Sequence, residues 1–336
     1  MLRNTVLLLT IIFALGLSSC EKVTAPRQLN ATFTDSTLFV LSEGLFGNNN
    51  AELDGYSLKK DVLQKSIISP LGDVGNDIQI IGNRLYVLLE NSNKILSVNP
   101  DSTNDRFAIN FPNGSTPYNM AKVSETEIWV SELTSKNVGV FNPQNNSFFS
   151  IPIDTSLAYL SIFKGKAYLL TNANMLEVLD VATWAVLGKT YMGDYPAQIC
   201  IDTARNSLLV LIYGDASVAK TASKIFWVDP TTYKKTDSVT IASTDFANQM
   251  ILTGTKAFLT FGDRLGYLNL DSHTLFKFND SVYYKGIYDP FNDQLILGKG
   301  SYTAPGNVDI VDATTGAVKK TFGGGLLPGH FAIYRK

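Results

Sequence analysis

Residues 85–100 read Leu-Tyr-Val-Leu-Leu-Glu-Asn-Ser-Asn-Lys-Ile-Leu-Ser-Val-Asn-Pro, two short apolar runs on either side of a polar turn. Both runs are rich in residues that favour strands. The second run ends in Asn99-Pro100, a pair that opens a type I turn because the Asn side chain accepts from the backbone and Pro presets φ. The stretch therefore predicts two neighbouring strands followed by a tight turn.

Related stretches recur along the chain. The apolar run occurs seven times, and its central residues are 37 to 49 positions apart: Val40, Val87, Val130, Leu169, Val210, Leu259 and Ile296. This period matches the ~40–50 residues of a four-stranded propeller blade. In most units a second strand follows after about ten residues and ends in an Asn or Asp. The repeated spacing of these acids and amides identifies them as turn formers, not as catalytic carboxylates.

A third strand precedes the apolar run in every unit except the first. The chain supplies the missing strand at its far end, in Phe331-Ala332-Ile333-Tyr334. Pairing of this last strand with the first unit would close a ring and leave little open edge. We therefore expect an all-β, seven-bladed β-propeller with four-stranded blades, forming a single domain over residues 35–336. Two separate β-sandwiches are the rival fold, but they explain neither the period nor the last strand.

Composition excludes several classes of function. The chain carries 28 Lys and Arg against 30 Asp and Glu, so it has no basic field for nucleic acid. Two cysteines and two histidines are too few for a disulfide framework or a Cys/His zinc cluster. Cys200 lies between Ile199 and Ile201, as expected of a small core residue. We expect no cofactor.

The N-terminus has the features of an export signal. Arg3 precedes an apolar run from Val6 to Leu17, which is too short to span a bilayer but suits a secretory signal. The run ends in Leu17-Ser18-Ser19-Cys20, which resembles the bacterial lipobox. We therefore expect a signal peptide over residues 1–19, lipidation of Cys20 and a flexible tether over residues 20–34. The alternative is an ordinary signal peptide with an incidental cysteine.

A candidate binding site follows from the repeat. If the strands of a blade are named A to D from axis to rim, the D-to-A and B-to-C loops share one face, here called the D-to-A face. Seven equivalent positions precede the apolar start of strand A, and Gly286 occupies one of them. The other six carry polar side chains that suit a polar, largely uncharged ligand: Asp77, Asn119, Tyr159, Gln198, Gln249 and His330. Alternatively, they bind only backbone amides and water.

Aromatic residues accompany this ring of polar side chains. Four are expected to give the ligand apolar contact: Phe46, Tyr118, Tyr195 and Tyr284. Aromatic walls with a few directed polar groups are typical of small-molecule sites.

Catalytic motifs are absent from the sequence. It contains no G-x-S-x-G, P-loop, dinucleotide-binding or calcium-loop motif. His273 falls in a turn on the opposite face, which leaves His330 as the one histidine on the D-to-A face. We therefore expect no catalytic residue, no bound metal and no enzymatic activity. The alternative is a lactonase or another hydrolase, with Asp77 and His330 binding a metal.

The repeats resemble the YncE-like propellers, in Leu85-Tyr86-Val87, in residues 91–95 and in residues 228–232. More narrowly, residues 39–50 and 71–78 resemble a group of bacterial surface lipoproteins with such propellers. Some members of that group capture cobalamin and sit on a TonB-dependent outer-membrane transporter. The resemblance implies a monomeric lipoprotein that is bound to the outer membrane only by its lipid, on the cell surface or the periplasmic side. It would capture a small polar ligand, which is a corrinoid in some members of this group, and hand it to a transporter. The alternative is an envelope protein–protein interaction module without a small ligand.

Overall fold

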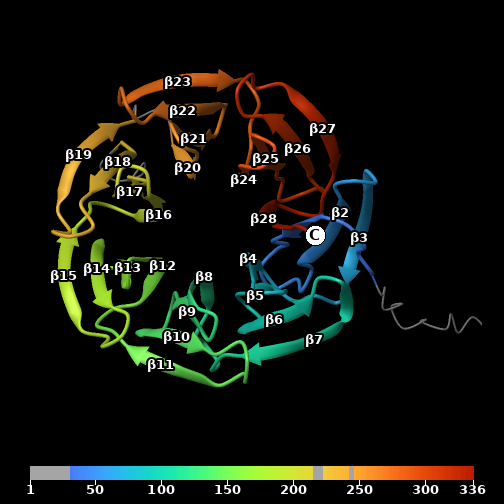
Figure 1. Ribbon diagram of the computed structural model, residues 1–336, viewed down its shortest axis with the longest axis horizontal. Helices are drawn as coiled ribbons and strands as arrows, with labels where there is room; N and C mark the ends of the chain where they lie inside the picture. The colour runs from blue at the N-terminus through green and yellow to red at the C-terminus, as the bar shows by residue number, and fades with distance from the viewer. Residues whose placement is uncertain (1–30, 215–221, 242–245) are drawn as a thin grey trace, which may run out of the picture.

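The computed structural model describes residues 31–214, 222–241 and 246–336. These residues form 28 β-strands and no helix, arranged as seven four-stranded antiparallel sheets around a central axis (Figure 1). The prediction of an all-β, seven-bladed propeller is therefore confirmed. Within the described ranges, no helix is long and apolar enough to cross a membrane.

The strands of the seven blades occupy four equivalent positions, A to D from the axis to the rim. The innermost (A) strands are β28 (Pro328–Tyr334), β4 (Gly75–Ile81), β8 (Pro117–Ser124), β12 (Leu157–Phe163), β16 (Pro196–Asp202), β20 (Ala247–Leu252) and β24 (Lys285–Asp289). The B strands are β1 (Thr37–Ser42), β5 (Arg84–Leu89), β9 (Glu127–Glu132), β13 (Lys166–Thr171), β17 (Ser207–Ile212), β21 (Lys256–Phe261) and β25 (Gln294–Lys299).

The two outer positions complete each blade. The C strands are β2 (Glu52–Ser57), β6 (Lys94–Asn99), β10 (Asn137–Phe141), β14 (Met175–Asp180), β18 (Lys224–Val228), β22 (Leu265–Asn269) and β26 (Asn307–Asp312). The D strands, on the rim, are β3 (Val62–Ile68), β7 (Ser102–Asn110), β11 (Phe148–Pro152), β15 (Val186–Tyr191), β19 (Lys235–Thr240), β23 (Thr274–Asn279) and β27 (Val318–Gly323).

The C-terminal strand closes the ring. β28 lies between the axis and β1, and the two strands pair antiparallel from Thr37 opposite Tyr334 to Leu41 opposite His330. The first blade therefore takes its inner strand from the end of the chain, as predicted. Joining the two ends of the chain in one sheet pairs the inner edge of β1, which would otherwise be open.

The hydrophobic core lies between neighbouring blades. The B strands are almost completely buried, and their side chains alternate between the two adjacent blades. One cluster, for example, joins Phe39 and Leu53 of the first blade to Leu85 and Val87 of the second. Each blade buries both of its faces against its neighbours. Its apolar runs are therefore continuous in the sequence, whereas a half-exposed strand would alternate apolar and polar residues.

The turns between C and D strands have the expected chemistry. The Asp229 carboxylate accepts from the backbone N–H groups of Thr231 and Thr232, at 2.8 and 2.7 Å. Asp312 makes the same pair of contacts in the last blade, with Thr314 and Thr315. These acids therefore stabilise turns on the face away from the D-to-A loops.

The first described residue, Ala31, lies four residues before the expected start of the domain at Asp35. Ala31 exchanges backbone and hydroxyl hydrogen bonds with Thr103 of β7, and Phe33 is 2% exposed and packs on Phe39. These contacts and the burial of Phe33 attach residues 31–34 to the propeller. The predicted signal peptide, Cys20 and the first part of the tether lie outside the described residues.

Candidate functional site

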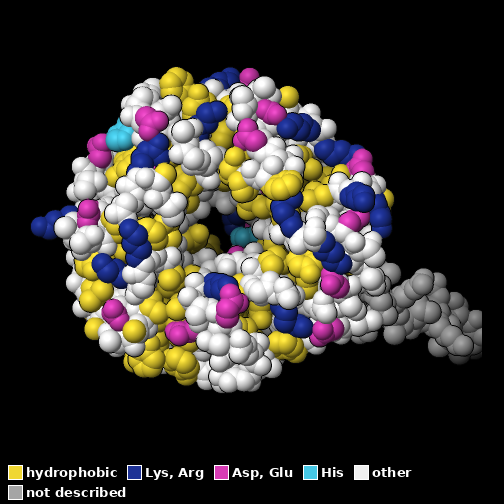
Figure 2. All heavy atoms as spheres, in the orientation of Figure 1, with side chains coloured by type: hydrophobic (Ala, Val, Ile, Leu, Met, Phe, Trp, Pro, Cys, Tyr) yellow, Lys and Arg dark blue, Asp and Glu magenta, His cyan; other side chains and the backbone are white. Residues whose placement is uncertain are grey.

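A cavity of about 610 Å³ occupies the axis of the propeller toward the D-to-A face. The space-filling view shows the axis as an open hole through the ring (Figure 2). Seven of the ten residues expected to bind a ligand line this cavity: Asp77, Tyr118, Asn119, Tyr159, Gln198, Gln249 and His330. The structure therefore brings together, around one axis, positions that are spread over about 250 residues of sequence.

The other three expected residues lie outside the lining. Phe46 is 70% exposed and Tyr195 is 58% exposed, both in loops of the D-to-A face. Tyr284 is half-buried, and its hydroxyl donates to Glu43 Oε2 at 2.8 Å. Phe46 and Tyr195 can therefore touch only a ligand or partner that extends beyond the cavity.

A β-bulge marks the mouth of the cavity in six of the seven blades. Immediately before each ring position except Gly286, the inner strand carries one residue with no partner in the B strand, namely Asn76, Tyr118, Ala158, Ala197, Asn248 or Gly329. Bulges bend a strand and redirect its side chains, and they are common beside binding sites. This local insertion explains why Tyr118 and Asn248 line the cavity.

The polar ring joins four of the blades to the blade that follows. Asp77 Oδ2 accepts from the backbone N–H of Met120 at 2.8 Å, and Asn119 Oδ1 accepts from that of Leu160 at 3.0 Å. Gln198 Oε1 accepts from the backbone N–H of Met250 at 2.8 Å. In the following blade, Gln249 Oε1 accepts from that of Gly286 at 2.6 Å. Four ring side chains thus satisfy backbone donors of the neighbouring inner strand, as the structural alternative for these residues anticipated.

The series is interrupted at Gly286, which has no side chain. A Cβ atom here would lie 2.5 Å from the carbonyl oxygen of Ile296, so only glycine fits. A charged cluster fills the corresponding part of the mouth, where Lys285 Nζ lies 2.7 Å from Glu43 Oε1 and 3.2 Å from His330 Nε2. The same carboxylate oxygen lies 3.0 Å from His330 Nε2. We call Glu43, Tyr284, Lys285 and His330 the closure cluster, because they join the last blade to the first.

Burial and charge shift the pKa values of the closure cluster. Burial alone would raise the pKa of Glu43, but its contacts with His330 and Lys285 outweigh burial and lower the pKa to about 2. Burial and the nearby positive charge of Lys285 lower the pKa of His330, against the opposing effect of Glu43. The cluster therefore holds an ionised Glu43 and a neutral imidazole at neutral pH.

Carboxylates lie close to Tyr118 in the cavity wall. Burial raises the pKa of Asp77, although the N–H groups of Met120 and Ile78 oppose that shift. Burial, then the charges of Glu43, Glu90 and Asp77, raise the pKa of Tyr118 to about 12. The carboxylates of Glu43, Glu90 and Asp77 thus lie near Tyr118. The ammonium group of the closure cluster is that of Lys285.

Several lining residues were not predicted from the sequence. Tyr213 follows β17, and its hydroxyl donates to the carbonyl oxygen of Asn248 at 2.9 Å. Asn76, Asn248 and Lys285 directly precede ring positions. For Asn76 and Asn248, this one-residue offset combined with a bulge would have been the signal, whereas Lys285 lies in the blade without a bulge.

The groups at the mouth can form hydrogen bonds and balance charge. Within the described ranges, no group of three or more His, Cys, Asp or Glu side chains is placed to hold a metal ion. Asp77 and His330 both line the cavity, but Asp77 accepts bonds from Ile78, Gln79, Asn119 and Met120. The arrangement therefore suits recognition of a polar molecule.

Comparison with known proteins supports the fold. No protein-family model matches the chain, and no curated protein matches it. Among solved structures, a putative 6-phosphogluconolactonase from Bacteroides fragilis is 11% identical, with a TM-score of 0.68 over 90% of this chain and 99% of that one. The periplasmic gluconolactonase of Pseudomonas aeruginosa is 10% identical, with a TM-score of 0.66 over 88% and 99%. A Lactobacillus plantarum protein is 9% identical, with a TM-score of 0.64 over 90% and 99%. At these identities the likeness shows a shared propeller architecture, in agreement with the YncE-like propeller class.

Proposed function

We propose that this protein is a lipid-anchored envelope protein that captures a small polar molecule at the D-to-A mouth of its axial cavity. The observation that carries the proposal is the convergence of Tyr118, Tyr159, Tyr213 and Gln249 on one cavity of about 610 Å³. Aromatic walls with a few directed polar groups are the usual composition of small-molecule sites. Corrinoids are the ligand class that the resemblance implies, and a transporter would receive the ligand.

The position of the first described residues supports this arrangement. Ala31 contacts Thr103 at the start of β7, and Lys336 Nζ at the C-terminus donates to the carbonyl of Phe33 at 2.6 Å. Both contacts lie toward the face opposite the cavity mouth. A lipid tether attached at Cys20 would therefore leave the D-to-A face unobstructed.

Calorimetry tests the capture function directly. Mature protein titrated with cyanocobalamin and with cobinamide should give saturable heat, and Tyr118→Ala should weaken binding because this ring lines the mouth. Val318→Ala, on the exposed face of the rim strand β27, is the matched control. Absence of heat with both corrinoids would reject this ligand class.

The anchor is tested separately. Cys20→Ser should move the protein from the membrane fraction to the soluble fraction and abolish labelling by a fatty-acid analogue. Retention in the membrane fraction with undiminished labelling would contradict lipidation at this residue.

A second candidate is a docking module for another envelope protein. The observation in its favour is the pair of exposed aromatic side chains, Phe46 and Tyr195, in loops beside the mouth. Aromatic residues are enriched in the centres of protein interfaces. Co-purification of a stoichiometric partner in mild detergent, together with no small-molecule binding, would favour this function over capture.

A further inference from the structure

The hydrogen bonds that hold neighbouring blades together use the acceptor oxygens of the ring side chains. In four of its contacts between blades, the side-chain oxygen of Asp77, Asn119, Gln198 or Gln249 accepts from a backbone N–H of the next blade. The strongest acceptors of the ring are therefore engaged in holding the propeller together. A ligand can bind to the polar groups of the lining that these contacts do not use.

Three of the polar groups that remain are donors. Gln249 Nε2 and the hydroxyl of Tyr118 both belong to lining residues, and neither has a hydrogen bond with any residue in the described ranges. Lys285 Nζ has two close contacts, Glu43 Oε1 and His330 Nε2, so one of its three N–H groups can serve a ligand. These three groups come from β20, β8 and β24.

Charge restricts which acceptors can use these donors. The carboxylates of Glu43, Asp77 and Glu90 lie close enough to disfavour ionisation of Tyr118. An anionic ligand would be repelled by them, and Lys285 is already paired with Glu43 at 2.7 Å. An ammonium ligand would instead compete with Lys285 and find the ring oxygens occupied.

We infer that the axial cavity recognises an uncharged carbonyl group, of the carboxamide class, through Gln249 Nε2, the Tyr118 hydroxyl and the Lys285 ammonium. The inference rests on the proposed capture function and specifies the chemistry of the captured group. A neutral carbonyl oxygen has two lone pairs, so it can accept from two of these three donors at a time, and it brings no net charge toward the nearby carboxylates.

Three probes with the same ring and different head groups test the inference. Benzamide, benzoate and benzylammonium are titrated at neutral pH into the mature protein, and the chemical shifts of its labelled tyrosine rings are followed by NMR. Benzamide should bind with a Kd at least about fivefold lower than the other two, because removal of a single donor–acceptor pair changes affinity by roughly 3- to 10-fold.

Two substitutions locate the effect. Gln249→Glu replaces the free amide nitrogen and keeps an oxygen that can accept from Gly286, so the contact between blades is retained. Tyr118→Phe removes the hydroxyl without changing the charge. Each should raise the Kd of benzamide about 3- to 10-fold. Gln144→Glu, in an exposed turn of the opposite face, adds the same charge far from the cavity and should leave the Kd unchanged.

The outcomes separate this inference from the function on which it rests. Binding of benzoate or benzylammonium as tight as that of benzamide overturns it, as does a benzamide Kd that is unchanged in both variants. If corrinoids bind while the three probes show no preference for benzamide, the inference fails and capture stands. If neither corrinoids nor benzamide perturb the cavity, both fail.

Discussion

Gln198 binds the backbone of Met250 at both of its polar groups, although the two residues belong to different blades. Its Oε1 accepts from the Met250 N–H at 2.8 Å, and its Nε2 donates to the Met250 carbonyl at 2.9 Å. The side chain therefore bonds to Met250 as the backbone of a paired strand would, and it links β16 to β20. A residue expected to contact ligand is, in this structure, also a connection between blades.

Gln198→Ala should consequently lower stability. It leaves the N–H and C=O of Met250 without their side-chain partner, at a cost of about 2 kcal/mol in the free energy of unfolding. Urea denaturation measures this loss. Gln198→Glu keeps the accepting oxygen and should cost less than the alanine variant. Equal stability of wild type and Gln198→Ala would show that the contact contributes nothing.

Acid should weaken the joint between the last blade and the first. The folded-state pKa of Glu43 is about 2, below its ordinary value of 4.5, because the contacts with His330 and Lys285 outweigh burial. A depressed pKa of an acid contributes stability that is present above pH 4.5 and is lost as the pH falls toward 2. The shift corresponds to about 3 kcal/mol. The depressed pKa of His330 acts in the same direction, starting from its ordinary value of 6.5.

The control for this prediction is Glu43→Gln, which can accept hydrogen bonds but cannot titrate. Its free energy of unfolding, measured in urea between pH 2.5 and 5, should fall less steeply with decreasing pH than that of the wild type. Parallel curves for the two proteins would show that Glu43 does not contribute to acid sensitivity.

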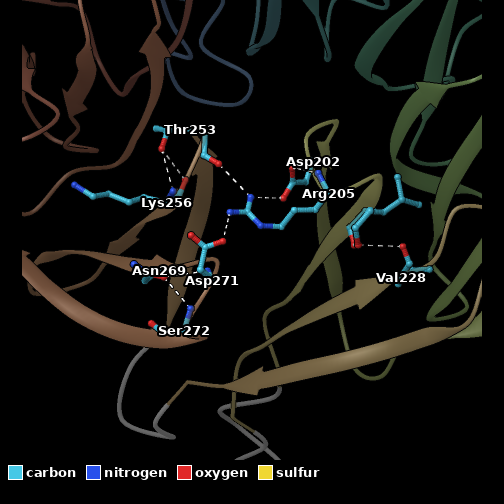
Figure 3. A network of polar contacts seen from close by, with 11 residues as sticks. Asp202, Arg205, Val228, Thr253, Lys256, Asn269, Asp271 and Ser272 are labelled. Atoms are coloured by element: carbon cyan, nitrogen blue, oxygen red, sulfur yellow. Dashed lines mark hydrogen bonds and ion pairs between the residues drawn. The ribbon is translucent and has the colours of Figure 1, made fainter.

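Arg205 should stabilise the junction of the same two blades that Gln198 joins, but on the opposite face. Its Nη1 donates to Asp202 Oδ2 at 2.9 Å and its Nη2 to Asp271 Oδ1 at 2.5 Å, so the guanidinium links a turn of one blade to a turn of the next (Figure 3). Asp202 is 4% exposed. Arg205→Met leaves that buried carboxylate without its cation and should cost about 1–3 kcal/mol.

An exposed ion pair provides the comparison for Arg205. Lys122 pairs with Glu125 at the surface, and Lys122→Met should change the free energy of unfolding by less than about 0.5 kcal/mol. If the two variants lose equal stability, the link between blades is no stronger than an ordinary surface pair.

The periodicity of the sequence was sufficient to predict the fold, because each blade buries both faces and so repeats its apolar runs. The ring positions were also recognised, since Pro117, Pro196 and Pro328 each begin an inner strand two residues before one. The closure cluster could not be predicted this way. Glu43 and Lys285 are 242 residues apart, and closure of the ring by β28 brings them together.

The bulges explain why other lining residues were not predicted from the sequence. A two-residue alternation assigns one face to each strand residue, and an inserted residue breaks that alternation. Asn76 and Asn248 reach the cavity because they are the inserted residues. Phe46 and Tyr195, in contrast, were expected at the wall because of their loops, and loop position does not fix the depth of a side chain.

Removal of the last strand should open the ring. Deletion of residues 328–336 takes away β28, exposes the edge of β1 and removes His330 from the closure cluster. We expect loss of cooperative unfolding and concentration-dependent association, measured by calorimetry and by light scattering. A truncated chain that stays monomeric and unfolds cooperatively would show that closure is dispensable.

Phe46 should affect recognition without affecting stability. The side chain is 70% exposed, while its loop is fixed from below by a hydrogen bond from the Gly47 N–H to Asp73 Oδ2 at 2.9 Å. Phe46→Ala should therefore leave the urea midpoint unchanged, since little apolar area is lost from the core. A corrinoid that covers the mouth would lose its contact with this ring and bind roughly 3- to 30-fold more weakly, whereas benzamide, held within the cavity, would bind as before. Equal losses for both molecules would instead mean that Phe46 shapes the cavity, and no loss for either would remove Phe46 from the binding surface.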